Sequence, residues 1–183
     1  MSREDALALV KEHVSKRNWI NHMLAVEAIM KDLAERFGED GEKWGLLGLL
    51  HDIDFEETEN APAHHGLRAE ELLKGKVSED IVKAIKSHNY DHTGVKPESR
   101  MEKALIAADA VSGLIVASAL VLPSKKVDEV TVETLLKKFK QKDFARGVDR
   151  SRVGIHEEVE LSREEFFELA LNSMKKIGPL IGL

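Results

Sequence analysis

The chain contains no cysteine. Disulfide bonds, thiolate metal ligands and a cysteine nucleophile are therefore excluded, and any transition-metal site must use imidazole and carboxylate ligands. The absence of cysteine also fits a reducing compartment, and the charged, amphipathic start of the sequence lacks the apolar core of a signal peptide. We therefore expect a cytoplasmic protein.

Basic charge is also scarce, because 27 lysines and arginines face 33 aspartates and glutamates, for a net charge of −6. General nucleic-acid binding needs a basic surface, so we expect none. One apolar run, residues 104–122, reaches the length of a membrane span, but it is rich in alanine and carries Asp109 near its middle. We interpret it as a buried helix and expect no membrane association.

Alternating strand patterns, repeats and linkers are absent, whereas helical periodicity runs through most of the sequence. We expect stretches 55–63 and 89–99 to be loops. Helices are expected at residues 2–13, 20–37, 41–50, 65–74, 78–88, 100–122, 131–140 and 162–177. The prediction is an all-α protein with one domain over residues 1–183, built as a bundle of about seven to nine helices.

Several polar residues fall on the apolar faces of these helices, namely His22, His51, His65, His88 and Asp109. A single histidine in such a place is more often a hydrogen-bonded core residue than a ligand. An ionised carboxylate such as Asp109 is different, because burying it is costly unless it is paired, protonated or bound to a metal. A salt bridge to a distant cation is the structural alternative for Asp109. Together with Asp52, the histidines would be satisfied at once by a divalent cation.

The order His22, then His51 with Asp52, then Asp109, resembles the HD superfamily of metal-dependent phosphohydrolases. The sequence around them is similar too: residues 48–54 (Gly-Leu-Leu-His-Asp-Ile-Asp), the pair at 65–66, residues 84–88 (Ala-Ile-Lys-Ser-His) and residues 107–109 (Ala-Ala-Asp). Segments 122–125 and 144–148 resemble an uncharacterised subgroup of predicted HD hydrolases. One departure is Ala69-Glu70, where the family often has glycine and then alanine.

The resemblance implies a single HD domain with a metal-binding core at about 20–115 and a helical extension at 123–183. It implies one or two divalent ions (Fe, Mn, Zn, Co or Ni), held by His22, His51, Asp52, His65, His88 and Asp109. Asp52 would bridge the two ions, and Asp52, His65 and His88 would form the catalytic group. The implied reaction is hydrolysis of a phosphate ester, of a small molecule or nucleotide, by a metal-activated water. Phosphomonoesterase and phosphodiesterase both remain open.

A phosphorylated substrate also needs cations from the protein. Residues 137–152 form a basic island in an acidic protein, although a solvated helix face is the simpler interpretation for most of its lysines. Our candidates for phosphate binding are Arg68, Lys125 and Arg146. Asp54 and Asp91 are candidates for supporting the ligands. We interpret Trp19 and Trp44 as core or helix-start anchors, and the remaining histidines as surface residues: His13, His64, His92 and His156.

Two other functions use the same residues. A di-iron oxygenase of the HD type would need the same ligands, so the motif does not separate it from a hydrolase. A non-catalytic, ligand-binding regulatory module is the second alternative, although it would have no need to keep all of His22, His51, Asp52 and Asp109. The substrate and the oligomeric state are left open.

Overall fold

A computed structural model describes all of residues 1–183. It contains α-helices and short 3-10 turns but no strand, so the predicted all-α class is confirmed. The helices are α1 (Arg3–His13), α2 (Arg17–Phe37), α3 (Gly41–Leu50), α4 (Phe55–Thr58), α5 (Leu67–Leu73), α6 (Glu79–His88), α7 (Tyr90–Thr93), α8 (Arg100–Leu120), α9 (Val132–Lys140), α10 (Arg150–Gly154) and α11 (Arg163–Ile181). The structure has more helices than the seven to nine predicted because it includes α4, α7 and α10. These three helices have only four or five residues and therefore show no periodicity in the sequence.

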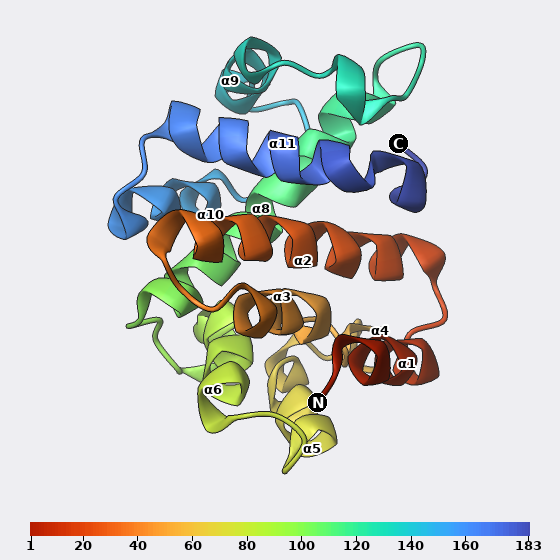
Figure 1. Ribbon diagram of the computed structural model, residues 1–183, viewed down its shortest axis with the longest axis vertical. Coiled ribbons are helices and arrows are strands. Elements are labelled where there is room, and N and C mark those ends of the chain that lie inside the picture. Colours follow the sequence, from red (N-terminus) through yellow and green to blue (C-terminus); the bar gives the residue numbers. More distant parts are fainter.

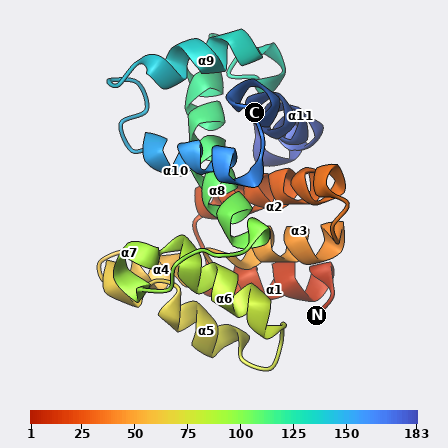
Figure 2. The same cartoon turned by 90° about the vertical axis from the view of Figure 1, so that its left-hand side faces the viewer.

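Two long helices, α2 and α8, organise the fold. Figure 1 shows α11, α2 and α3 stacked one above another, with α8 running behind them at a steep angle. The quarter turn of Figure 2 shows α8 along the middle of the molecule, with α9, α10 and α11 around its C-terminal half and α6 near its start. The segments that carry the predicted ligands therefore meet where α2, α3, α6 and α8 come together.

Helix α8 is the apolar run noted in the sequence. By length and composition it is the one helix that could cross a membrane, but 67% of its most apolar stretch is buried inside the protein. Ala104, Leu105 and Ala108 are fully enclosed by neighbouring helices. The interpretation as a buried core helix is confirmed, while the cytoplasmic location stays a prediction.

Helices α2 and α3 approach each other unusually closely. A Cβ atom added at Gly48 would lie 2.8 Å from the carbonyl oxygen of Val26 and 2.9 Å from the backbone nitrogen of Glu27. Real side chains do not tolerate such distances to backbone atoms, so only glycine permits this contact. The close approach brings the end of α3, and with it His51, against the helix that carries His22.

The ends of several helices match the sequence prediction. Ser2 caps α1 by accepting a hydrogen bond from the Asp5 backbone, and Gly38 ends α2 in the left-handed conformation, with φ of 69°. Helix α2 begins at Arg17 rather than residue 20, because the Lys16 carbonyl already accepts hydrogen bonds from Trp19 and Ile20.

Two predicted helices have different bounds in the structure. The helix expected from residue 65 begins only at Leu67, because Gly66 has a positive φ of 86°, which leaves His65 in extended backbone before it. Helix α11 continues through Pro179 to Ile181 instead of ending at residue 177. The Asn21 side chain donates to the Ile181 carbonyl at 2.8 Å and holds this last turn on α2.

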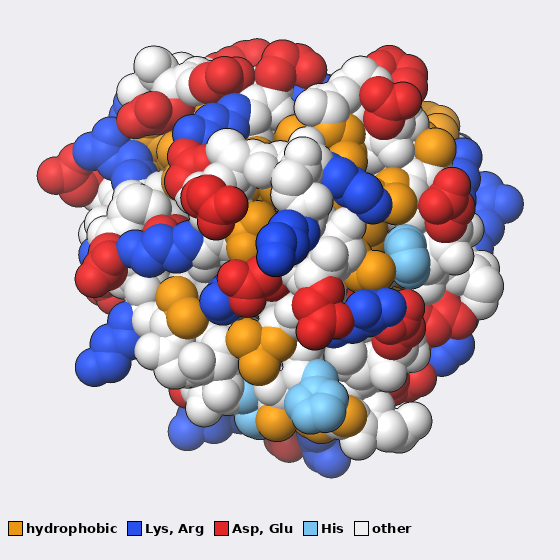
Figure 3. Space-filling model, turned by 90° about the horizontal axis from the view of Figure 1, so that it is seen from below, with side chains coloured by type: hydrophobic (Ala, Val, Ile, Leu, Met, Phe, Trp, Pro, Cys, Tyr) orange, Lys and Arg blue, Asp and Glu red, His pale blue; other side chains and the backbone are white.

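A contiguous cluster of 43 buried apolar residues extends from Ala6 in α1 to Ile181 in α11. It takes side chains from the expected metal-binding core and from the expected extension alike. On the face seen in Figure 3, acidic and basic side chains are interspersed rather than gathered by sign.

Candidate metal centre

The six predicted ligands come from five parts of the chain. His22 lies in α2 and Asp109 lies in α8. His51 caps the end of α3 and is followed by Asp52, while His88 is the last residue of α6. His65 precedes α5. His51, His65 and His88 are buried, and the other three are partly exposed.

Five of the six side chains form two overlapping groups that meet at Asp52. His22, His51 and Asp52 make one group in which the ligand atoms lie within 4.8 Å of one another, and Asp52, His65 and His88 make the other. The Asp52 Oδ1 atom lies 3.3 Å from His65 Nε2, 3.4 Å from His88 Nε2 and 3.5 Å from His51 Nε2. Its Oδ2 atom lies 3.6 Å from His22 Nε2. Asp52 thus faces both groups at once.

Asp109 closes the first group from the opposite helix. Its Oδ1 atom lies 3.1 Å from His22 Nε2 and 3.9 Å from His51 Nε2. It forms no ion pair with a lysine or arginine, so the structural alternative of a salt bridge to a distant cation is wrong.

The outer nitrogen of each histidine is held by a neighbouring acceptor. His51 Nδ1 donates to the Gly48 carbonyl at 2.8 Å, and His88 Nδ1 donates to the Ile85 carbonyl. His22 Nδ1 lies 3.1 Å from the Ser112 hydroxyl oxygen, whose own proton goes to the Asp109 carbonyl. Carbonyl acceptors place the ring proton on Nδ1 and leave the Nε2 lone pair free to bind a metal.

Asp54 holds the fourth histidine, His65, in the same way. This fully buried carboxylate accepts from His65 Nδ1 at 2.9 Å through Oδ1. Its Oδ2 atom accepts from the backbone N–H groups of Gly66 at 2.8 Å and Ala69 at 2.9 Å. Asp54 therefore both orients His65 and organises the start of α5.

The Nε2 atoms of the histidines consequently point at one another. The Nε2 atoms of His65 and His88 are 2.9 Å apart, and those of His22 and His51 are 3.3 Å apart. Two imidazole lone pairs at such distances repel unless a positive charge lies beside them. The donor set, neutral imidazoles with two carboxylates and no sulfur, fits Fe, Mn, Zn, Co or Ni.

In the protein alone, protons supply part of that positive charge. Burial opposes protonation of His65, but its hydrogen bonds with Asp52 and Asp54 raise its pKa to about 10. Burial likewise opposes ionisation of Asp52 and Asp109, yet the surrounding histidines keep the pKa of Asp52 well below its usual range, and His22 lowers the pKa of Asp109. A metal ion competes for the same lone pairs.

The ligands open into a cavity of about 340 Å³. Beyond the ligands, its walls consist of two aromatic residues, Trp19 and Phe55, and two polar ones, Asn89 and Arg152. A second cavity of about 360 Å³ shares His22, Asp109 and Arg152 with the first and extends past Gly113 and residues 147–149. The sequence predicts Trp19 to be a core or helix-start anchor, but its side chain is partly exposed and lines this cavity. Trp44 is buried, as predicted.

Arg152, which the sequence did not single out, is the basic residue in this wall. It extends from α10, and its guanidinium donates to the His88 carbonyl at 2.6 Å and to Asp91 at 2.9 Å. With a side chain that is 19% exposed, it lines both cavities. No local pattern separates Arg152 from the other basic residues of 137–152, because its position depends on the fold.

The three predicted phosphate-binding cations lie elsewhere. Arg68 is engaged by Glu57 and Glu71, and the exposed Arg146 pairs with Asp143. Lys125 is exposed in the turn after α8. None of the three lines either cavity at the metal cluster, and their role in binding phosphate stays a prediction.

His156 corrects the interpretation of the remaining histidines. His64 and His92 are exposed and His13 is partly so, but His156 is fully buried. It stacks on Phe166 with ring centroids 5.4 Å apart, and its Nδ1 donates to the Leu161 carbonyl at 2.9 Å. The acidic residues that follow it suggest a surface turn, whereas the packing of this turn against α8 and α11 encloses the ring.

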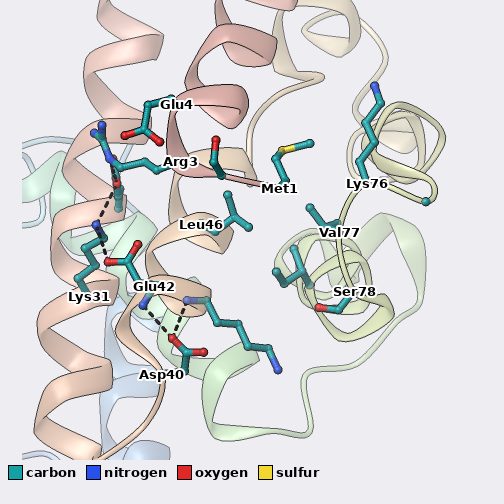
Figure 4. Close-up of a pocket in the computed structure, with 15 residues that line it drawn as sticks. Met1, Arg3, Glu4, Lys31, Asp40, Glu42, Leu46, Lys76, Val77 and Ser78 are labelled. Carbon is teal, nitrogen blue, oxygen red and sulfur yellow. Dashed lines mark hydrogen bonds and ion pairs between the residues drawn. The ribbon is translucent and has the colours of Figure 1, made fainter.

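Another cavity, of about 800 Å³, lies away from the metal cluster, between the starts of α1, α3 and α6. Figure 4 shows its charged walls, with Arg3, Lys31 and Asp40 among them. Arg3 and Lys31 both pair with the buried Glu27, and the Asp40 carboxylate caps α3. Lys43 is paired with Asp80. These charges largely neutralise one another, and no metal-binding group of histidines lies there.

With the fold and the ligand geometry established, the sequence can be placed in a family. The HD domain family model matches residues 19–114, just over half of the chain. This protein therefore belongs to the HD domain family, as its motifs predicted. All six ligand residues lie inside the matched segment, whereas Arg152 lies outside it.

Among curated proteins, the symmetrical bis(5'-nucleosyl)-tetraphosphatase of Bacillus subtilis (strain 168) is 29% identical over 133 residues, which are 61% of this chain and 69% of that protein. Ribonuclease Y of Oleidesulfovibrio alaskensis is 31% identical over 99 residues, which are 53% of this chain but 18% of that protein. Ribonuclease Y of Lawsonia intracellularis is 32% identical over 98 residues. No solved structure gave a significant match.

Proposed function

We propose that this protein is a metal-dependent phosphohydrolase that cleaves a phosphate ester of a small molecule. The observation that carries the proposal is the convergence of four histidine Nε2 atoms on two carboxylates, with each outer nitrogen held by its own acceptor. Membership of the HD domain family and the similarity to a tetraphosphatase support the same conclusion.

In this proposal His22, His51, Asp52 and Asp109 hold one ion, while His65 and His88 hold a second that shares Asp52. Bound divalent ions supply activation of water and neutralisation of charge on phosphorus oxygens. The protein orients the ligands through Asp54, Ser112 and the backbone carbonyls described above. Asp52, His65 and His88 are its proposed catalytic group.

Arg152 is the proposed phosphate-binding cation. Two of its N–H groups are fixed by the His88 carbonyl and by Asp91, which places the guanidinium at the junction of the two cavities. Its Nε atom lies 3.9 Å from an Asp149 oxygen, and the guanidinium lies over the Tyr90 ring. In this proposal a phosphoryl oxygen takes the N–H groups that the His88 carbonyl and Asp91 leave free. More distant candidates for phosphate binding are Arg68, Lys125 and Arg146, which would contact the substrate only if it extends beyond the cavities.

The relative's name supports a nucleotide as the substrate class, since that enzyme acts on a bis(5'-nucleosyl) tetraphosphate. Both a phosphomonoester and a phosphodiester agree with a cavity on each side of Arg152.

The test is elemental analysis of the purified protein, followed by phosphatase and phosphodiesterase assays with Mn, Fe, Co, Ni, Zn and Mg. We expect a bound transition metal and hydrolysis of at least one class of ester. The Asp52→Ala variant should lose both metal and activity, because Asp52 faces both groups of histidines. Glu57→Gln, which changes an exposed carboxylate on α4, is the matched control and should retain both.

Unchanged metal content in Asp52→Ala would contradict the ligand assignment. If the protein binds iron, hydrolyses no ester with any metal and consumes oxygen, the di-iron oxygenase replaces the hydrolase. If the protein binds metal but neither hydrolyses an ester nor consumes oxygen, we would interpret it as a regulatory ligand-binding module.

A further inference from the structure

Two aromatic side chains beside the metal cluster have no part in ligation. Trp19 lies one helical turn before His22 in α2, and Phe55 begins α4 three residues after Asp52. They are the two apolar residues of the cavity wall, and both are partly exposed. Their rings meet edge to face, with centroids 5.1 Å apart and an interplanar angle of 89°.

Packing of the hydrophobic core does not account for this pair. Phe55 is absent from the residues that pack against the core, and its aromatic contacts are with Trp19 and, at 5.4 Å, with His65. Trp19 touches the core but stays partly exposed. The Lys16 ammonium covers one part of the indole, 3.8 Å from a ring centroid, yet Lys16 does not line the cavity. Trp19 itself does line the cavity.

An aromatic wall next to a phosphate-binding centre matches a ligand that carries a planar ring close to its phosphate. Bases of nucleotides stack on tryptophan and phenylalanine, and this contact is tolerant of base identity because every base has a π face. A cavity of about 340 Å³ lies in the range of ordinary small-molecule sites.

We propose that Trp19 and Phe55 form a stacking site for the base of a nucleotide whose phosphate lies at the metal centre. This inference rests on the proposed function and narrows its substrate to nucleotides.

The site recognises an aromatic ring rather than one particular base. Asn89 is the side chain of the cavity wall best suited to read a base by hydrogen bonding. Both of its amide N–H groups already donate elsewhere, to the Pro62 and His65 carbonyls at 2.9 Å each. Its oxygen accepts from His92 at 3.0 Å. With these groups occupied, purine and pyrimidine nucleotides should both bind, with purines tighter because they offer a larger stacking surface.

The test uses intrinsic fluorescence, since the chain has only two tryptophans. In Trp44→Phe, all tryptophan emission comes from Trp19. We expect AMP to quench it at saturation, because the base contacts the indole, and ribose 5-phosphate, which lacks the base, to leave it unchanged. The reciprocal variant Trp19→Phe reports on Trp44, which is buried in α3, and AMP should leave that emission unchanged.

Kinetics on a nucleotide that the enzyme hydrolyses provide the second readout. Trp19→Leu keeps an apolar side chain but removes the aromatic face, so KM for the nucleotide should rise roughly tenfold while kcat changes little. Trp19→Phe should recover most of this loss. The far-ultraviolet circular dichroism spectrum and the content of bound metal should be the same in all three proteins, which shows that the variants are folded.

The outcomes separate this proposal from the preceding one. Quenching of Trp19 by AMP without hydrolysis of any ester supports the stacking site and overturns the hydrolase. Hydrolysis of nucleotides with no quenching, and with equal KM in Trp19→Leu and the unchanged protein, supports the hydrolase and overturns the stacking site.

Discussion

At the scale of single residues, Asp54 fixes the orientation of the His65 imidazole in the candidate metal site. Its two oxygens accept three hydrogen bonds, from the imidazole and from two backbone N–H groups at the start of α5. Because the carboxylate is fully buried, replacing it leaves its hydrogen-bond donors without an acceptor, and no solvent is present to take its place.

We therefore expect Asp54→Asn to weaken metal binding although Asp54 is not itself a ligand. An amide offers one acceptor oxygen to three donors, so His65 loses its fixed orientation. Binding of the ion that we propose for His65 and His88 should weaken by about 10- to 100-fold. The free energy of unfolding of the metal-free protein should fall by about 1–3 kcal/mol. Metal titration and urea denaturation measure the two effects, and equal metal affinity in both proteins would remove Asp54 from the site.

Much of this residue-level picture could be predicted from the sequence. His22, His51, Asp52 and Asp109 were singled out because polar groups on apolar helix faces coincided with a family motif, and Asp54 was a candidate for support. Arg152 and His156 were not recognised. Their positions depend on how α10 and the following turn pack on α8, which is a tertiary contact that no local pattern contains.

At the scale of the helices, the close contact of α2 with α3 holds His22 and His51 together. Gly48 permits this contact, and its carbonyl accepts the Nδ1 proton of His51. Gly48 therefore contributes both to the packing of α2 on α3 and to the orientation of His51.

Replacing this glycine tests that link. In Gly48→Ala the new methyl group meets backbone atoms of α2, so the helices must separate, and we expect a loss of about 1–3 kcal/mol in the free energy of unfolding. Metal affinity should fall as well, because His51 moves with α3. Gly41→Ala is the control on the same helix, since its Cβ would lie 3.8 Å from the nearest atom, an ordinary contact. Equal stability of the two variants would contradict the tight contact.

The helices themselves differed in how well they could be predicted. Helix α9, for example, has the cap residue Thr131 and a periodic apolar face, and its bounds follow from these. The acidic stretch 55–63 and the loop 89–99 contain α4, a 3-10 turn at Pro62–His64 and α7, which span only one turn each. Such turns are stabilised by contacts with the rest of the molecule rather than by their own sequence.

At the scale of the whole molecule, the metal centre joins α2, α8 and the ends of α3 and α6. An ion bound only by the folded protein stabilises the fold by about 2.7 kcal/mol when its free concentration is about 100 times Kd. For a chain of this size, that corresponds to a rise in Tm of roughly 5–11 °C. Calorimetry of chelator-treated protein with and without added Mn²⁺ measures this rise.

Asp52→Ala should melt at the same temperature with and without the ion, because its site no longer binds. An equal rise in the unchanged protein and in this variant would show that the ion acts elsewhere on the surface.

The position of Arg152 in the chain has a consequence for how the cavities can be altered. The ligands lie within residues 19–114, while the arginine at the junction of the two cavities comes from the later segment that folds back over α8. The candidate ligands and Arg152 thus come from separate stretches of the chain. A substitution at residues 147–152 would therefore reshape the cavity wall without replacing a candidate ligand, so the width of the opening and the ligand set can be varied independently by mutagenesis.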